Sequence, residues 1–121
     1  MINDMSKALN IRESDIQKTI LDWLAFQPGV KAFRTNNIGV PMPSKDGRAR
    51  FRPSPVKGLA DILVCWQGRF VAIEVKRPGK HPTDDQSTFL DDVIRTGGIG
   101  IVAHSLEDVQ RMMKSLSFNN P

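Results

Sequence analysis

The sequence predicts an α/β fold in which helices flank a mixed β-sheet. Two observations lead to this prediction: a hairpin pattern of β-branched and aromatic residues spans residues 62–75, and amphipathic helical patterns precede and follow it. The predicted order along the chain is helix, strand, strand, strand, helix, strand, helix. The hairpin strands are antiparallel, whereas the last strand must return through the second helix, so we expect a mixed sheet.

The length and composition of the chain fit one domain without a membrane segment. Its 121 residues, 40% of them hydrophobic, suffice for one core, so we expect a single domain over residues 1–121 with a core at about 11–116. No apolar run is long enough to span a membrane, and the first ten residues lack the hydrophobic stretch of a signal peptide. The single cysteine, Cys65, falls inside a predicted strand, which indicates a buried thiol and a cytoplasmic protein.

Composition also excludes several classes of protein. The sequence contains no tyrosine, which rules out tyrosine-nucleophile strand transfer and the GIY-YIG type of nuclease. One cysteine and two histidines are too few for a zinc finger. Residues 74–80 do not form a phosphate-binding loop, because Glu74 stands in place of the first glycine and no Ser or Thr follows Lys80.

The first helix is predicted over residues 11–27. Ile16, Ile20 and Leu24 recur every four residues, and Pro28-Gly29 ends the pattern. Glu13 falls on the same apolar stripe, where a carboxylate needs a partner. Two interpretations remain open: Glu13 reaches a metal site on the hairpin, or it lies in the first turn, where the helix dipole favours an acid and water stays close.

A first strand over residues 31–36 is followed by a long, irregular and basic arm over residues 38–58. Four prolines and five lysines and arginines fall in this stretch. If the arm is extended, Arg48, Arg50 and Arg52 share one face, which suits contact with a phosphate backbone. The alternative is a solvated hairpin or a disordered loop. We favour the phosphate interpretation because loops of this length in compact domains usually carry function.

The hairpin pattern predicts which charged residues lie together on one face of the sheet. With Gln67 and Gly68 as the two turn residues, Trp66 pairs with Arg69, and counting back along both strands sets Asp61 directly opposite Glu74. Directly opposed residues project from the same face of a sheet. Lys76 lies two residues beyond Glu74 and therefore shares this face, while Val71, Ile73 and Val75 point the other way.

Two carboxylates at one cross-strand position repel each other and need compensation. Lys76 offsets one negative charge. A carboxylate pair on a rigid hairpin is also how proteins hold Mg²⁺, which takes oxygen ligands and completes its octahedron with water. The competing interpretation is a surface ion-pair cluster on an exposed face. The Asp at the paired position makes the metal interpretation stronger than a Glu-x-Lys pattern alone would.

The remaining elements follow the hairpin in order. Thr83 to Gln86 form a predicted capping box at the start of the second helix, whose buried face is expected to contain Phe89, Leu90, Val93 and Ile94. Gly97-Gly98 ends this helix, and residues 99–103 predict the last strand. A final helix begins near Ser105. His81 and His104 lack metal-ligand spacing, and we expect them to be satisfied by hydrogen bonds or exposed to solvent rather than catalytic.

Positive charge is concentrated around the carboxylate pair. Between Lys31 and Lys80 there are eleven lysines and arginines against three acidic residues, a net charge of +8, whereas the whole chain carries +4. A basic segment around two isolated carboxylates is typical of a polyanion site that holds a metal. The residues expected to contact nucleic acid are Arg34, Arg48, Arg50, Arg52, Lys57, Arg77 and Lys80.

The combination of Glu13, Gly58-x-x-Asp61, Glu74-Val75-Lys76 and Gln86 resembles the virus-type replication-repair nuclease domain, VRR-NUC. That family belongs to the PD-(D/E)XK superfamily, whose restriction-endonuclease-like αβββαβ core has the order derived above. The resemblance covers about residues 11–109. It departs from many relatives at Ala60, where they have proline, a position that shapes the entry to the strand and does not touch the metal.

The resemblance implies a role for each matching residue. Asp61 and Glu74 would be metal ligands together with the backbone carbonyl of Val75, and Glu13 would add a carboxylate directly or through water. Lys76 would position or deprotonate the attacking water, or neutralise charge in the transition state. Gln86 would orient that water or Lys76, beside its capping role.

The function implied by the resemblance is a Mg²⁺- or Mn²⁺-dependent DNA endonuclease acting in replication, repair or recombination. Stand-alone domains of this kind resemble dimeric enzymes directed at branched DNA such as Holliday junctions, in bacteria or phage-infected cells. Two alternatives stay open: a non-catalytic nucleic-acid-binding module on a nuclease scaffold, and a sequence-specific restriction-type endonuclease.

Overall fold

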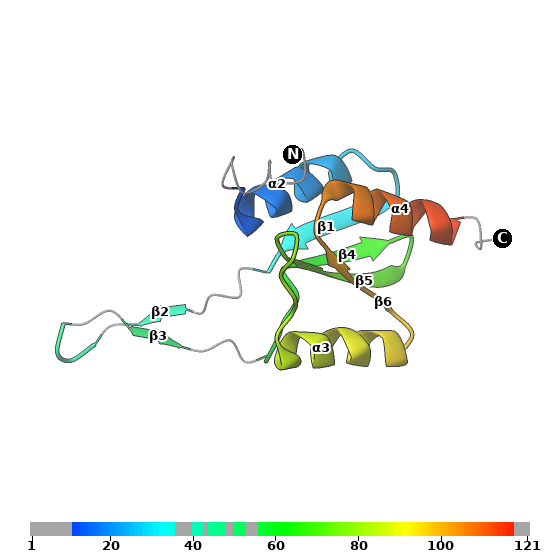
Figure 1. Ribbon diagram of the computed structural model, residues 1–121. Coiled ribbons are helices and arrows are strands. Elements are labelled where there is room, and N and C mark those ends of the chain that lie inside the picture. Colours follow the sequence, from blue (N-terminus) through cyan, green and yellow to red (C-terminus); the bar gives the residue numbers. More distant parts are fainter. Residues whose placement is uncertain (1–10, 36–39, 43, 48–49, 53–55, 118–121) are drawn as a thin grey trace.

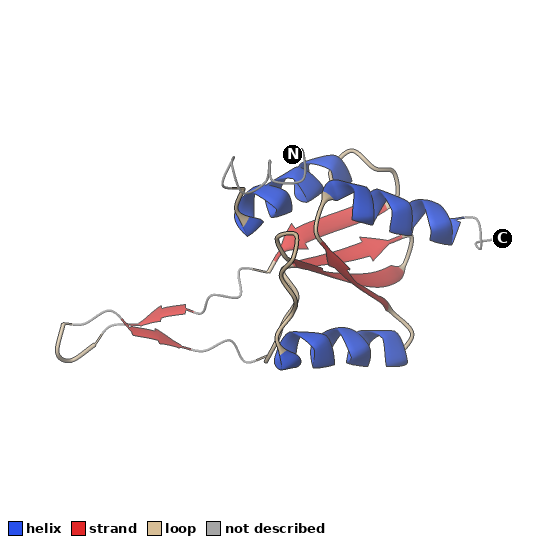
Figure 2. Cartoon of the chain, viewed as in Figure 1, coloured by secondary structure: helices blue, strands red, loops and turns tan. Residues whose placement is uncertain are grey.

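A four-stranded mixed sheet lies between two layers of helices (Figures 1 and 2). The computed structural model describes residues 11–35, 40–42, 44–47, 50–52 and 56–117. The strand order in this sheet is β1-β4-β5-β6. Its strands are β1 (Val30–Arg34), β4 (Ile62–Trp66), β5 (Arg69–Val75) and β6 (Ile99–Ala103), and its helices are α2 (Glu13–Leu24), α3 (Asp84–Arg95) and α4 (Leu106–Ser117).

The β4–β5 hairpin has the register that the sequence predicts. Gln67 and Gly68 form the turn with φ angles of 50° and 83°, the positive values that a two-residue hairpin turn requires at both central positions. Trp66 pairs with Arg69, and Ile62 pairs with Ile73 at the other end of the ladder. The same register, continued by one residue, sets Asp61 opposite Glu74.

The last strand makes the sheet mixed, as predicted. β6 pairs in parallel with β5, and α3 forms the crossover between them. β1 pairs antiparallel with β4 on the opposite side of the hairpin. The predicted fold class, α/β with a mixed sheet flanked by helices and an additional C-terminal helix, is therefore confirmed.

Alternation along the strands divides the apolar residues between two cores. The larger core lies beneath α2 and α4, where Ile20, Leu24 and Val109 pack against the face that includes Ile62 and Ile73. The smaller core lies beneath α3 and consists of Ala60, Ala72, Leu90 and Val93. Glu74 is also buried on the α3 side, because it follows Ala72 by two residues.

α3 covers only part of its face of the sheet, and two burial predictions on this side are wrong, each for its own reason. The helix packs over β5 and β6, which leaves the outer half of the face, on β1 and β4, without a helix. Cys65 lies in this uncovered half and is exposed, not buried. Ile94 was assigned to the buried face of α3 but is 53% exposed, because it lies beside the edge strand β6, near Gly100.

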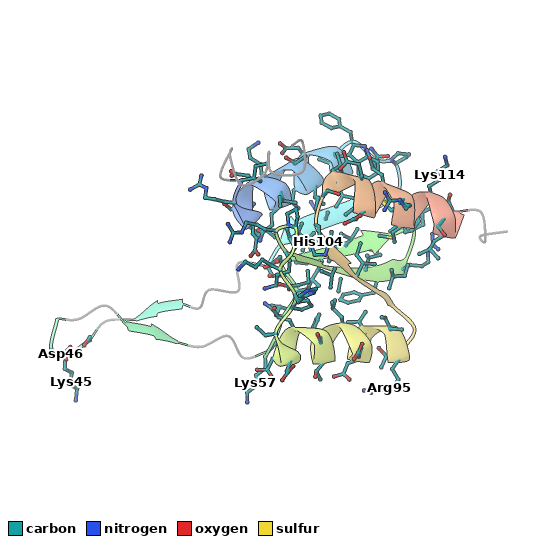
Figure 3. The ribbon with its side chains drawn as sticks, in the orientation of Figure 1. Lys45, Asp46, Lys57, Arg95, His104 and Lys114 are labelled. Carbon is teal, nitrogen blue, oxygen red and sulfur yellow. The ribbon has the colours of Figure 1, made fainter. Side chains whose placement is uncertain are left out.

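The predicted basic arm contains a short hairpin of its own. β2 (Val40–Met42) pairs antiparallel with β3 (Arg50–Arg52), which corrects the expectation of an irregular stretch. The hairpin projects from the body of the domain, with Lys45 and Asp46 near its tip (Figures 1 and 3).

The boundaries of two elements differ from those predicted. α2 spans Glu13–Leu24 rather than residues 11–27, because Arg12 has an extended backbone and its N–H is bonded to the Asp15 carboxylate at 3.1 Å. β1 ends at Arg34 rather than at residue 36. No helix in the described ranges is long and apolar enough to cross a membrane.

Truncation of a buried aliphatic side chain in the larger core should lower the free energy of unfolding. Ile20 is fully buried, so Ile20→Ala is expected to lower the free energy of unfolding by about 2–5 kcal/mol. Ile94→Ala, on a side chain that is 53% exposed, is the matched control and should change it by less than about 0.5 kcal/mol. Urea denaturation measures both; equal losses would contradict the assignment of the core.

Candidate active site

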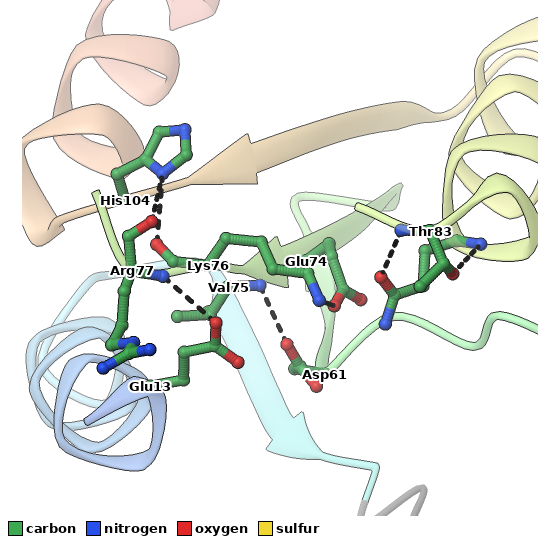
Figure 4. Close-up of polar contacts among 9 residues, drawn as sticks. Glu13, Asp61, Glu74, Val75, Lys76, Arg77, Thr83 and His104 are labelled. Carbon is green, nitrogen blue, oxygen red and sulfur yellow. Dashed lines mark hydrogen bonds and ion pairs between the residues drawn. The ribbon is translucent and has the colours of Figure 1, made fainter. Parts of the chain in front are cut away.

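The carboxylates of Asp61 and Glu74 meet on the α3 side of the sheet (Figure 4). Asp61 stands immediately before β4, and its Oδ2 accepts a hydrogen bond of 2.8 Å from the backbone N–H of Val75. Glu74 lies on β5 with only 1% of its surface exposed. Because Asp61 is bonded to the residue that follows Glu74, both carboxylates are fixed by the same hairpin.

Lys76 joins the pair, as the alternation along β5 predicts. Its Nζ lies 3.8 Å from Oε2 of Glu74, and its side chain is mostly buried. The backbone N–H of Lys76 donates to the carbonyl of Ala103 on β6 at 3.0 Å. A hydrogen bond to the neighbouring strand therefore fixes the backbone from which the ammonium group extends.

Glu13 reaches the same region from the first turn of α2. Its Oε2 accepts a hydrogen bond of 3.2 Å from the backbone N–H of Arg77, across 64 residues of sequence. Its negative charge is also one of the influences that raise the pKa of Glu74. Glu13 therefore lies in a first helical turn, as one of the two interpretations has it, and its carboxylate also contacts the segment that follows Glu74. A role of Glu13 toward a metal stays a prediction.

The electrostatics of the site are unfavourable for the charged form of Glu74. Burial is the main cause that raises the pKa of Glu74 from the ordinary value of 4.5 to about 8. The neighbouring Asp61 raises it further, and Lys76 opposes both effects only in part. Within the described part of the chain, Oε1 of Glu74 has no hydrogen-bond partner. Lys76 therefore compensates the two carboxylates only in part, and one buried oxygen of Glu74 has no partner among the described residues.

The donor atoms suit a hard divalent cation. The carboxylates of Asp61 and Glu74 offer oxygen ligands, and the backbone carbonyl of Val75, which the VRR-NUC resemblance implies as a third ligand, would also offer oxygen. Among the described residues, no three His, Cys, Asp or Glu side chains lie close enough to form a metal cluster by themselves. This arrangement fits Mg²⁺ better than Zn²⁺, because Mg²⁺ commonly uses one or two carboxylates and keeps several waters.

Gln86 forms the predicted capping box at the start of α3. Its side-chain oxygen accepts from the N–H of Thr83 at 2.9 Å, and its own N–H donates to the Thr83 hydroxyl at 3.2 Å. The capping role is confirmed. The role of Gln86 toward an attacking water or Lys76 stays a prediction.

The loop that leads to Asp61 passes so close to α3 that only glycine fits at position 58. Its φ angle is +69°, and a Cβ at this position would lie 2.0 Å from the backbone oxygen of Asp85 in α3. The loop therefore packs directly against the first turn of α3. Lys57 extends from this loop near the same end of the helix (Figure 3), and a groove there is lined by Val56, Lys57, Gly58, Leu59, Thr83, Asp85 and Gln86.

Two supporting residues were not identified from the sequence. The hydroxyl of Thr35 donates to the carbonyl of Ala60 at 2.7 Å, which ties the end of β1 to the residue before Asp61. The ring of His104 contacts the backbone that follows Glu74 and Val75. Neither residue has a local sequence pattern that would reveal it, because its partner lies more than twenty residues away.

The residues expected to contact nucleic acid are described to different extents. Arg34, Lys57, Arg77 and Lys80 are exposed, and Arg77 directly follows the site. Arg48 lies outside the described residues. The backbones of Arg50 and Arg52 belong to β3, but their side chains are outside the described part of the structure. Their contact with DNA stays a prediction.

Comparison with solved structures supports the fold. The chain is similar to a structure described as a "VRR_NUC domain protein", with a TM-score of 0.57 and 15% sequence identity over 86% of each chain. No family model matches the sequence. No curated protein matches it either. The structural likeness confirms that the fold is restriction-endonuclease-like, as the VRR-NUC resemblance implies. The carboxylate site described above lies on this fold.

The raised pKa of Glu74 predicts a defined pH dependence of stability in EDTA. Below pH 4.5 the carboxyl is protonated in both states. Between about pH 4.5 and 8 only the unfolded state ionises, so stability falls as pH rises. Glu74→Gln removes this penalty. The free energy of unfolding of the variant, relative to that of wild type, should therefore rise between about pH 4.5 and 8 and stay constant above that range.

Urea denaturation across about pH 3.5 to 9, which extends about one unit beyond each end of the titration, measures this difference. The exposed Glu107 supplies a matched Glu→Gln substitution on α4. A constant difference between Glu74→Gln and wild type over the whole range would contradict the raised pKa.

Proposed function

We propose that this chain is a divalent-metal-dependent DNA endonuclease that hydrolyses phosphodiester bonds. The observation that carries the proposal is the buried Glu74, opposed by Asp61 and only 3.8 Å from Lys76, on a fold like that of a VRR_NUC domain protein. A buried pair of carboxylates weakens the fold unless something compensates it. A bound cation would supply this compensation and would explain why the protein keeps the carboxylates together.

The proposed cofactor is Mg²⁺ or Mn²⁺. Asp61, Glu74 and the Val75 carbonyl would hold it, and Glu13 would contribute directly or through a water. When bound, such a cation lowers the pKa of a coordinated water and stabilises charge on the phosphate oxygens. The protein contributes a fixed, largely water-free position for Glu74 and a donor set that prefers hard cations.

Lys76 is proposed as the group that acts on the reacting phosphate or water. Its ammonium lies beside Glu74 and is mostly buried, so its charge is poorly screened by solvent. It would position the attacking water, take its proton or neutralise charge developing on the phosphate. Gln86, fixed by its cap, would orient the water or Lys76 from the first turn of α3.

The proposed substrate is DNA, bound through the basic middle of the chain. The segment from Lys31 to Lys80 carries a net charge of +8, which favours a polyanion and predicts strong salt dependence of binding. We further propose branched DNA, such as a four-way junction, as the preferred substrate, in replication, repair or recombination. The proposed location is the cytoplasm of a bacterium or of a phage-infected cell.

Two alternatives have specific support. The basic middle of the chain could bind DNA without any metal, which favours a binding module on a nuclease scaffold. The β2–β3 hairpin is a two-stranded ribbon, and such a ribbon fits the major groove of DNA, which favours a sequence-specific endonuclease. Incubation with supercoiled plasmid, linear duplexes and four-way junctions, with Mn²⁺ or EDTA, separates the three. Absence of metal-dependent nicking on every substrate favours the binding module.

The metal assignment predicts the behaviour of Asp61→Asn. The asparagine oxygen can still accept the Val75 N–H, so the hairpin should fold, but a ligand charge is lost. We expect cleavage to fall by at least about 100-fold while DNA binding persists. The rise in melting temperature that Mg²⁺ or Mn²⁺ gives to wild type should also shrink.

Asp22→Asn is the matched control, because Asp22 is an exposed carboxylate on α2 paired with Lys18. It should retain wild-type cleavage and the full metal-dependent shift. Cleavage by Asp61→Asn at the wild-type rate would refute the metal assignment.

A homodimer is proposed as the active assembly. One site cuts one strand, and two-fold symmetry delivers two cuts. The proposed surface for the second copy is the α3-side face of β1 and β4 together with the start of β5: Phe33 is 51% exposed and pairs with Leu63, and Phe70 is 46% exposed and pairs with Cys65. Aromatic residues with few charges are typical of an interface centre.

Substitution of the two phenylalanines tests this surface. Phe33→Glu combined with Phe70→Glu should convert a dimer into a monomer, since two buried charges would face each other across the axis. Light scattering after gel filtration measures the mass. Phe26→Glu is the control, because Phe26 is 86% exposed and follows α2 on the opposite face. A monomeric wild type, or a double variant that stays dimeric, would refute the proposed surface.

A further inference from the structure

The ring of His104 contacts the backbone directly behind the proposed active site (Figure 4). His104 follows β6, and its Nδ1 lies 3.1 Å from the carbonyl oxygen of Lys76 and 3.2 Å from that of Arg77. These contacts join residues 28 and 27 positions apart in sequence. The histidine is thus satisfied by hydrogen bonds, as the sequence predicts, but its partners belong to the segment that carries Lys76.

The partners of Nδ1 fix the protonation of the ring. Carbonyl oxygens only accept hydrogen bonds, so Nδ1 must carry a proton and donate it, shared between the two oxygens. A neutral His104 therefore has its lone pair on Nε2, which lies on the other side of the ring from the Lys76 and Arg77 carbonyls. The contact requires a donor at the position of Nδ1 and does not require a charge.

The backbone of His104 is itself fixed by α4. Its N–H donates to Oδ2 of Asp108 at 2.8 Å, and Oδ1 of Asp108 pairs with Arg111 at 3.1 Å. Asp108 lies in the first turn of α4, where an acid is favoured by the helix dipole. The ring is therefore presented from a helix terminus packed on the sheet, and not from a free loop.

The segment that leaves β5 is held from three directions. The N–H of Lys76 donates to the carbonyl of Ala103 on β6, and the N–H of Arg77 donates to the carboxylate of Glu13 on α2. His104 donates to the carbonyls of both residues. β5 ends at Val75, so Lys76 lies beyond the last paired strand residue. Without these contacts its backbone would be free to rotate, and its ammonium would not stay beside Glu74.

We propose that His104 is a positioning residue that orients Lys76 toward Glu74, an inference that rests on the proposed role of Lys76. The hydrogen bonds fix the Lys76 carbonyl, and hence the direction in which its side chain leaves the backbone. Small displacements of reacting groups are costly: about 1 Å can lower a rate by about 100-fold. Loss of this contact should therefore act on the chemical step more than on DNA binding.

Three substitutions at His104 separate positioning from packing. The side-chain amide of asparagine places a donor near the position of Nδ1, whereas that of glutamine extends past it and alanine has none. His104→Ala and His104→Gln should lower kcat by about 10- to 100-fold with KM within about threefold of wild type. His104→Asn should stay within about fivefold of the wild-type kcat. His81→Ala, on the exposed histidine of the preceding loop, is the control.

Amide hydrogen exchange on DNA-free protein gives a second measurement that does not depend on catalysis. His104→Ala and His104→Gln should speed exchange at Lys76 and Arg77, while His104→Asn keeps them protected. Unchanged exchange and unchanged kcat in His104→Ala would overturn the proposal, as would an Asn variant as slow as the Ala variant. Faster exchange in a protein whose wild type cleaves no DNA would support positioning and refute the nuclease function instead.

Discussion

The burial of Glu74 beside the partly exposed carboxylate of Asp61 is the constraint on which the rest of the structure depends. Two like charges on opposed strands disfavour the fold, and the burial of Glu74 adds to that cost. The sheet tolerates the pair because apolar side chains on its other face, beneath α2 and α4, stabilise the hairpin independently. The two faces of β5 thus differ: Ile73 and Val75 pack in the larger core, whereas Glu74 between them is a buried carboxyl with a raised pKa and one oxygen that has no partner among the described residues.

Lys76 illustrates how the surrounding elements complete this site. It forms an ion pair with Glu74 at 3.8 Å, yet it lies just past the end of β5, where pairing stops. Contacts from α2, β6 and the start of α4 converge on it and on Arg77. Each of these elements also packs in the larger core, so stability of the core and geometry of the site are linked. A substitution that loosens α2 or α4 would therefore affect the position of Lys76 without touching it.

The α3 side of the sheet combines chemistry with recognition. The helix covers β5 and β6, closes over Glu74 and anchors the loop at Gly58, while β1 and β4 remain uncovered. Phe33 on β1 and Phe70 at the start of β5 are exposed on this side, and the β2–β3 hairpin projects from the domain. These surfaces are therefore the ones on which the proposed contacts with a second copy and with DNA would be made.

The sequence by itself determined the element order, the hairpin register and the face shared by Asp61, Glu74 and Lys76, because turn residues and strand alternation act over a few residues. It also determined the cap at Thr83 and Gln86, again a local interaction. Tertiary structure alone decided the depth of Glu74, the exposure of Cys65 and Ile94, and the partners of Glu13 and His104. These outcomes depend on which strands a helix covers and on contacts 27 to 64 residues apart, and no local pattern encodes the packing of one element on another.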